Sequence, residues 1–340
     1  MTSIGEDAFV NCRSLSSVVL PDSLTNIGSR AFSGCSKLGD ITIPDSITYV
    51  GDAVFKNTLW LNEKLKLSNL VIYNDSLLAA NQNLTEVIVP ESVKIIDGRA
   101  FEGCTKLENI TFLGKITYVG EEAFAGCSGL NSITFSDGLT SIGKYAFSNC
   151  RNLNSIILPD SLTKIGEGAF FYCESLKEIE LSDNLTIIGN DAFKYCSSLE
   201  SIDIPKGITS IPANTFSCCS NLSSITLPES LSSIGELAFE DCTKLNNIIL
   251  PSNLNNIEMY AFTNCNSLEN VLIPEGVTYL PADIFSYCTN LKSVTIQNNE
   301  TEIHPTSFDG CDKELLVIKG GAGSTAETFA NNRGYKFEIQ

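Results

Sequence analysis

The sequence is short of the residues on which most enzymes and nucleic-acid-binding proteins depend. It has one histidine, one tryptophan and two methionines in 340 residues. No apolar run approaches the roughly eighteen residues that a membrane-spanning helix needs, so we expect no direct membrane insertion. Only 22 basic residues stand against 40 acidic ones, for a formal net charge of -18. This acidic excess excludes a nucleic-acid binder, which needs a basic surface.

Motifs for catalysis are also missing. The lone His304 excludes any mechanism that needs a pair of histidines, and the chain has no G-x-S-x-G, H-E-x-x-H or phosphate-binding loop in its required context. Three acidic residues, Glu178, Glu180 and Asp203, resemble a glycosidase carboxylate pair, but a solvated acidic patch is the default interpretation. We therefore expect no enzyme activity, no cofactor and no metal.

A repeat of 23 residues fills most of the chain. A phenylalanine marks each repeat, and the one missing position is taken by the apolar Leu78. A strict period of this kind predicts a solenoid, here of roughly fourteen coils, in which the repeated residues form the core. The repeated phenylalanines are Phe9, Phe32, Phe55, Phe101, Phe124, Phe147, Phe170, Phe193, Phe216, Phe239, Phe262, Phe285 and Phe308.

Each coil combines a strand with a turn. Leu153, Ile156 and Leu158 have the L-x-x-L-x-L spacing of a leucine-rich strand, and Pro159 ends that strand because proline cannot donate to a ladder. The I-G-x-x-A-F-x-x-C stretch that follows suits one or two helical turns with an inward face. Its glycine, such as Gly143, is expected at a tight turn where a Cβ would clash.

This consensus resembles the BspA-type leucine-rich repeat. The resemblance is carried by Ala31-Phe32-Ser33-Gly34-Cys35, Ala123-Phe124-Ala125-Gly126-Cys127 and Leu158-Pro159-Asp160-Ser161-Leu162, and it covers nearly the whole chain. It implies an α/β solenoid: a right-handed superhelix with a parallel β-sheet on the concave face and short helical turns on the convex face. The family occurs in surface proteins of host-associated bacteria and in mucosal protists.

The resemblance implies a non-enzymatic, adhesin-like binding module at the cell surface or secreted. Its partner would be a protein or another macromolecule, host-derived in such settings, and the chain itself a monomer. Residues 1–5 lack a signal peptide and already match the middle of a coil, so we expect a part of a longer protein. The alternative is a structural spacer or a cytosolic scaffold, with a cytoplasmic location if Met1 is the true start.

Thirteen cysteines raise the question of metal or disulfide chemistry. Twelve of them fill one slot of the repeat and so form a line, whereas a zinc site needs cysteines that converge on one point. We therefore expect a buried, reduced column of small apolar side chains. Cys218 alone is outside this register and is the best candidate for a reactive thiol.

Two segments depart from the repeat. Within 56–83 the phenylalanine, cysteine and proline positions of the repeat hold other residues. One interpretation is a distinct loop or hairpin that includes Trp60 and contacts a partner. The other is a variant coil in which the Trp60 side chain fills space. Residues 315–340 predict a C-terminal cap beyond the 1–314 solenoid. Its parts are a strand at 315–318, a helix opened by the S-x-x-E capping box of Ser324 and Glu327 and ending near Asn332, and a closing strand from Tyr335 to Ile339.

Outward positions of the strands are the predicted binding surface, because solenoids usually bind through their concave sheet. They lie eight and ten residues after each phenylalanine and are small and polar, with an acidic centre and no aromatic anchors. Together with Trp60 from the irregular segment, the candidate residues are Asp40, Glu86, Asn109, Thr134, Glu178, Glu180, Asp203, Thr226 and Asn247.

Overall fold

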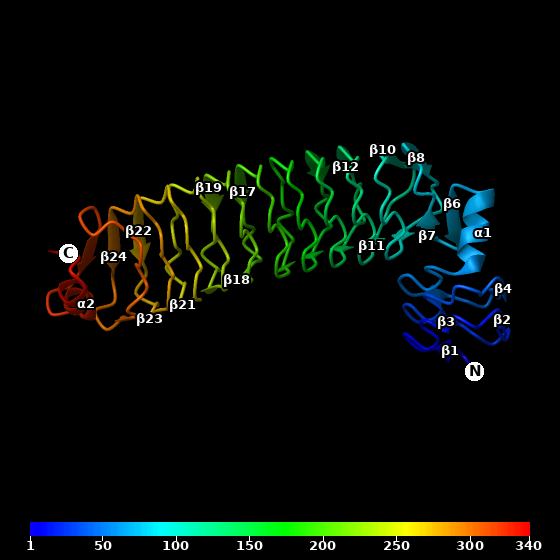
Figure 1. Cartoon of the computed structure of the whole chain (residues 1–340), viewed down its shortest axis with the longest axis horizontal. Helices are drawn as coiled ribbons and strands as arrows, with labels where there is room; N and C mark the ends of the chain where they lie inside the picture. The colour runs from blue at the N-terminus through cyan, green and yellow to red at the C-terminus, as the bar shows by residue number, and fades with distance from the viewer.

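The chain winds into an elongated parallel β-solenoid (Figure 1), in a computed structural model that describes all residues from 1 to 340. Equivalent strands pair in parallel with a shift of one repeat, as where Ser132 lies opposite Ser155 and Ser141 opposite Lys164. Each regular coil therefore contributes the same residues to the same layer of the core. The predicted leucine-rich repeat solenoid is confirmed, while its handedness and the assignment of the concave face stay predictions.

The longer strands form one column, in which outward residues, most of them polar, alternate with inward apolar ones. The outward Val19, Ile88, Ile157 and Leu272 are exposed apolar exceptions. This column is interrupted, and residues 176–181 keep the alternation without forming a strand. Its strands are β2 (Ser17–Val19), β4 (Asp40–Thr42), β8 (Glu86–Val89), β10 (Asn109–Phe112), β12 (Ser132–Thr134), β14 (Ser155–Ile157), β17 (Ser201–Asp203), β19 (Ser224–Thr226), β22 (Asn270–Ile273) and β24 (Ser293–Ile296).

A second column of two-residue strands runs along the opposite side of the coils. An isoleucine, valine or leucine directly precedes the turn of each coil and is buried in all of these strands except β5 and β25. The strands are β1 (Ser3–Ile4), β3 (Asn26–Ile27), β5 (Tyr49–Val50), β9 (Ile95–Ile96), β11 (Tyr118–Val119), β13 (Ser141–Ile142), β15 (Lys164–Ile165), β16 (Ile187–Ile188), β18 (Ser210–Ile211), β20 (Ser233–Ile234), β21 (Asn256–Ile257), β23 (Tyr279–Leu280) and β25 (Glu302–Ile303).

The stretch around each phenylalanine consists of β-turns, and the helical turns expected there are not formed. Two left-handed residues per coil interrupt any helix, for example Glu122 at φ 55° and Gly126 at φ 73°. The glycine before the turn is required for close approach: a Cβ on Gly143 would lie 2.6 Å from the carbonyl carbon of Gly120. This explains why the apolar spacing suggested a helix although the backbone cannot continue as one.

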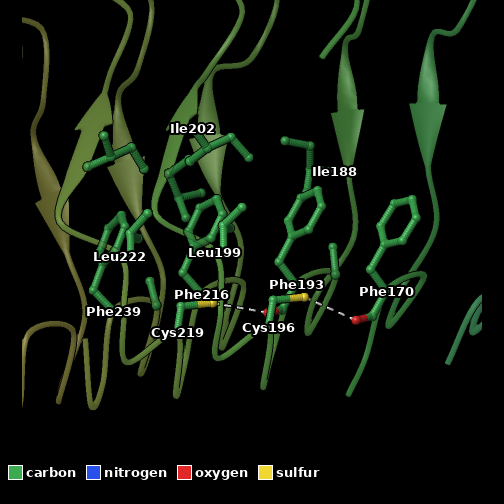
Figure 2. Close-up of a cluster of buried hydrophobic side chains, with 14 of the residues drawn as sticks. Phe170, Ile188, Phe193, Cys196, Leu199, Ile202, Phe216, Cys219, Leu222 and Phe239 are labelled. Atoms are coloured by element: carbon green, nitrogen blue, oxygen red, sulfur yellow. Dashed lines mark hydrogen bonds between the residues drawn. The ribbon is translucent and has the colours of Figure 1, made fainter. Parts of the chain in front are cut away.

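Phenylalanine rings stack along the core. Their centroids lie 4.9–5.9 Å apart in nearly parallel planes, and Figure 2 shows four consecutive rings from Phe170 to Phe239. The stack is broken between Phe55 and Phe101, where the irregular segment intervenes. Accordingly the core divides into a large cluster that begins at Leu77 and a small N-terminal cluster that ends at Ala79.

The irregular segment forms a corner in the solenoid. It contains helix α1 (Leu59–Leu67) and an antiparallel hairpin of β6 (Leu70–Tyr73) and β7 (Ser76–Ala80), and β7 also pairs in parallel with β9. All five residues of β7 are buried, since Leu77 and Ala80 pack in the large core cluster and Leu78 and Ala79 in the small one. In Figure 1 the coils before α1 stack at an angle to the rest.

The C-terminal segment comprises β26 (Val317–Gly320), α2 (Thr325–Arg333) and β27 (Lys336–Ile339), with β26 and β27 parallel and hydrogen-bonded to each other. Ser324 Oγ accepts from Glu327 N at 3.2 Å, so the capping box opens α2. The strand begins two residues later than expected, since the amides of Leu315 and Leu316 donate back to Asp312 in a turn. Phe329 and Tyr335 cover the last ring of the stack, Phe308.

Candidate binding surface

The outward strand positions all lie on one exposed side of the longer strands, which we call the polar strand face. Strand pairing places Glu86 beside Asn109 and Asp203 beside Thr226. The nine candidate residues on this face, all exposed, are Asp40, Glu86, Asn109, Thr134, Glu178, Glu180, Asp203, Thr226 and Asn247. Asp40 is set apart from the other eight, because it lies before the corner.

The acidic centre of the polar strand face is free of internal partners. Glu178 and Glu180 precede and follow the buried Ile179 in the chain and are both exposed, and Asp203 lies at the end of the next strand, β17. None of these three carboxylates takes part in a side-chain hydrogen bond or an ion pair, whereas many acidic residues on the turns are paired with lysine or arginine. Their negative charge is therefore available to a basic partner.

Trp60 is not part of the polar strand face. Its ring lies 4.7 Å from that of Phe55, and its amide donates to the Leu38 carbonyl at 2.7 Å. The residue thus fastens α1 to the small N-terminal core cluster. Both interpretations of residues 56–83 are correct in part, since the segment forms a distinct helix and hairpin and the half-buried Trp60 side chain fills space.

A cluster of aromatic side chains on the turns was not anticipated from the sequence. Tyr172 and Tyr195 stack with centroids 4.2 Å apart, and Phe171 meets both rings edge-on. Arg151 lies over the Tyr172 ring at 5.8 Å. The available signal was the pair of aromatic residues directly after Phe170, in slots that hold small or polar residues in most other coils.

The cysteine column is buried from Cys35 onward, and Cys12, in the first coil, is exposed. Each buried thiol of the column except Cys104 also donates to the carbonyl of a phenylalanine in the preceding coil: Cys196 Sγ lies 3.3 Å from Phe170 O, and Cys219 Sγ lies 3.1 Å from Phe193 O (Figure 2). Cys104, which follows the irregular segment, donates to Asn81 O instead. These contacts make the cysteines more than small apolar fillers. Burial raises the pKa of the Cys173 thiol well above its usual value, so the column stays protonated.

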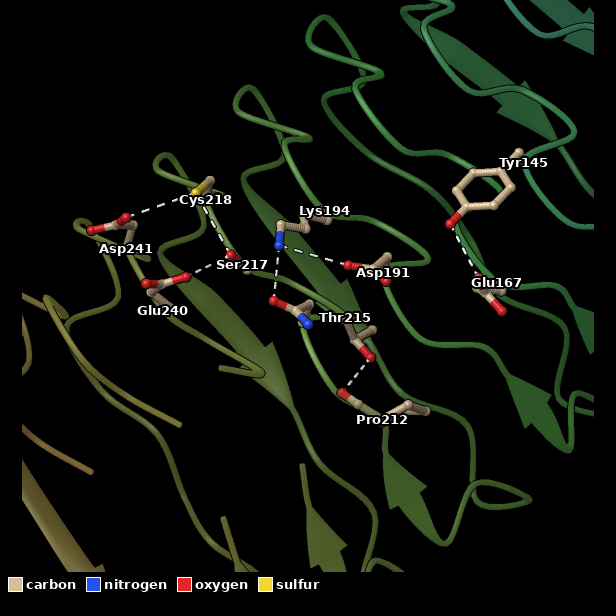
Figure 3. Close-up of polar contacts among 11 residues, drawn as sticks. Tyr145, Glu167, Asp191, Lys194, Pro212, Thr215, Ser217, Cys218, Glu240 and Asp241 are labelled. Carbon is tan, nitrogen blue, oxygen red and sulfur yellow. Dashed lines mark hydrogen bonds and ion pairs between the residues drawn. The ribbon is translucent and has the colours of Figure 1, made fainter. Parts of the chain in front are cut away.

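Cys218 lies on the turn surface beside two acidic residues (Figure 3). Its Sγ is 3.7 Å from Asp241 Oδ2, and Glu240 accepts a hydrogen bond from the neighbouring Ser217 at 3.0 Å. Partial burial raises the pKa of the Cys218 thiol, and the negative charges of Asp241 and Glu240 add to this effect. The thiolate is thereby disfavoured, which argues against the reactive thiol expected from the sequence.

His304 has a local role in the last turn. Its Nδ1 accepts a hydrogen bond from the Thr306 amide at 3.2 Å and lies 3.0 Å from the Thr306 hydroxyl. Both contacts are with a residue two positions away, so they hold the ring against its own turn. No helix of the chain is both long and apolar enough to pass through a bilayer.

Comparison with known proteins identifies the repeat. The family model of the BspA type leucine rich repeat region matches residues 2–131, 94–222 and 209–332. A leucine-rich repeat protein from Bacteroides ovatus is 27% identical over 89% of this chain and 87% of its own, with a TM-score of 0.54. The pneumococcal vaccine antigen PcpA shares the fold at 20% identity and a TM-score of 0.55, covering 96% of this chain and 79% of its own.

A leucine rich cell surface protein from Faecalibacterium prausnitzii is 26% identical over 96% of this chain and 85% of its own, with a TM-score of 0.43. No curated protein matches the chain. The family match extends over almost every coil, including the segments on both sides of the corner. The chain therefore belongs to the BspA-type leucine-rich repeat family.

Proposed function

We propose that the chain is a non-enzymatic binding module that engages a basic protein partner through the acidic centre of the polar strand face. The observation that carries this proposal is the group of three exposed, unpaired carboxylates of Glu178, Glu180 and Asp203. Unpaired charges on a rigid surface steer an oppositely charged partner at little cost in reorganisation. Membership of a family found in surface proteins supports a cell-surface or secreted location, and an adhesin-like role toward a host protein.

A charge-reversal variant tests this proposal. Glu178→Lys, Glu180→Lys and Asp203→Lys are combined, and binding to a panel of purified extracellular host proteins is measured by biolayer interferometry. We expect at least one basic protein to bind the native chain, and the triple variant to lose about tenfold or more in affinity. Binding should also weaken in about 0.5 M salt, because the charges are exposed to solvent and screened.

The matched control reverses three other exposed acidic residues, Glu91, Asp137 and Glu275, which lie outside the polar strand face. It changes the net charge by the same amount and should leave the affinity nearly unchanged. Equal losses in both variants would show that only overall charge matters. If no protein of the panel binds, or if the triple variant binds as the native chain does, the acidic centre is not the binding site.

A structural spacer is the second candidate, favoured by the absence of aromatic side chains at the outward positions of the polar strand face. A spacer would hold neighbouring domains apart without a ligand of its own. It predicts no partner in the same panel while the solenoid remains folded by circular dichroism.

A further inference from the structure

The corner forms a partly open cavity of about 490 Å³ between the N-terminal coils and the main body of the solenoid. Its walls come from the turn around Phe55, from α1, from β7 and from the turn that contains Asp97. The cavity exists because the irregular segment does not lay a regular coil upon Phe55. Its volume lies within the range of small-ligand and peptide pockets.

Backbone amides in this cavity lack the acceptors that they have elsewhere. In the regular coils from Phe9 to Phe262, the amides two residues before, at, and two residues after the phenylalanine donate to carbonyls of the next coil. Arg99, Phe101 and Gly103, for example, donate to Glu121, Ala123 and Ala125 at 2.9, 2.7 and 2.8 Å. This ladder of three N–H groups fastens each turn to the following one.

In the coil of Phe55, the equivalent amides belong to Ala53, Phe55 and Asn57, and none of them donates to a backbone carbonyl. The Asp97 carboxyl, only 3% exposed, lies beside the first of these amides, and the Ala53 N–H acts to lower its pKa. The Phe55 and Asn57 amides have no acceptor at all, and both residues line the cavity. These two N–H groups have no acceptor within the chain, so they are available to a ligand oxygen.

The rest of the lining defines what kind of ligand suits these two donors. Leu61 and Leu78 provide an apolar wall, and Lys56 lies between the two donor residues in the chain, with Nζ 2.6 Å from Glu102. The positive end of α1 begins beside Asn57, since Thr58 is its N-cap. Two free donors, the N-terminus of α1 and an apolar wall together favour a peptide carboxyl terminus, which is captured elsewhere by backbone amides. Glu102, the ion-pair partner of Lys56, also lines the cavity, so the carboxylate would share Lys56 with it.

We propose that the corner cavity binds the C-terminal end of a short apolar peptide, with a backbone carbonyl accepting from Phe55 N–H and the terminal carboxylate accepting from Asn57 N–H beside Lys56. In the regular coils the equivalent two amides donate to carbonyls that are two residues apart, so a ligand with oxygen acceptors at that separation can reach both. The penultimate and terminal side chains then lie against Leu61 and Leu78. This site is separate from the polar strand face.

The test compares acetyl-Ala-Ala-Val with a free carboxylate and the same peptide as a C-terminal amide. Isothermal titration calorimetry of the full chain should show at least about tenfold tighter binding of the free acid, because a charge-assisted hydrogen bond is lost in the amide. In ¹H–¹⁵N spectra, the amide resonances of Phe55 and Asn57 should shift downfield on binding. Equal affinities, or unshifted resonances at these two residues, would refute the assignment.

Two variants locate the site. Leu65→Trp places a large side chain over the cavity from the half-exposed face of α1 and should abolish binding while circular dichroism stays native. Lys56→Gln should reduce the preference for the free-acid peptide over the amide peptide, whereas Lys144→Gln, which removes a similar ion pair with Glu167 in a regular coil, should not.

The triple lysine variant of the polar strand face should bind the peptide as the native chain does. Retained binding in Leu65→Trp, or absence of binding by the native chain, would overturn the proposal.

Discussion

At the scale of single residues, each repeated side chain serves the neighbouring coils as much as its own. Phe147 illustrates this, since its ring stacks between those of Phe124 and Phe170 while its carbonyl accepts from both Cys150 N and Cys173 Sγ. A carbonyl has two lone pairs, so both donors can be accommodated. The repeated cysteine is thus explained by a hydrogen bond as well as by its small size.

Truncation of one ring within the stack should be strongly destabilising. We expect Phe193→Ala to lower the free energy of unfolding by about 3–5 kcal/mol, because the ring is fully buried and its removal leaves a cavity between two neighbours. The measurement is urea denaturation followed by circular dichroism. Phe9→Ala is the control: Phe9 is 39% exposed and stacks on one ring only, so its loss should be clearly smaller. Equal losses would show that stacking between coils contributes little.

At the scale of elements, the columns that run through the coils determine which groups meet solvent. The cysteine column is sealed by the coils on either side, and only the end at Cys12 is open. In the segments around the phenylalanines, left-handed residues hold the chain in β-turns, although the spacing of the apolar residues resembles that of a helix. An element in this protein is therefore defined by its neighbours as well as by its own residues.

The thiols should differ sharply in their reaction with a disulfide reagent such as Ellman's reagent. In the native chain we expect Cys12 to react fast and Cys218 slowly, while the buried thiols react only after denaturation because their pKa is raised by burial and they are inaccessible. Cys12→Ser should remove the fast phase and Cys218→Ser should not. Rapid reaction of many thiols in the native chain would contradict the sealed column.

At the scale of the whole molecule, the corner divides one continuous repeat into two cores. The coil that would have joined them is replaced by α1 and a hairpin, which removes a ring from the stack and the acceptors from three amides. Asp97 and Asp52 meet across this junction, since Asp52 Oδ1 accepts from Gly98 N at 2.8 Å. At the corner, therefore, backbone amides that donate to the next coil elsewhere in the solenoid need other hydrogen-bond partners.

The corner should also make stability depend on pH. Burial, followed by the charge of Asp52, raises the pKa of Asp97 well above its ordinary value of 3.8. An acid whose pKa is raised by folding contributes most to stability below its unfolded pKa, and this contribution falls as the pH rises toward the folded pKa. We expect Asp97→Asn to be more stable than the native chain at neutral pH, with the difference vanishing near the unfolded pKa.

Denaturation curves across the acidic to neutral range measure this difference. Asp137→Asn, at an exposed position, is the control and should leave stability unchanged throughout. A stability difference for Asp97→Asn that is the same at every pH would show that the carboxyl group is not responsible.

The sequence by itself determined the solenoid, the coil boundaries and the buried slots, because a strict period places the same side chains in the same layer of every coil. It also located the two departures, at Trp60 and after Cys311. Only the tertiary structure decided how the corner forms, which amides lose their acceptors and where aromatic residues gather. These features depend on what lies against a residue from a coil 20 or more positions away, and no local pattern in the chain specifies that contact.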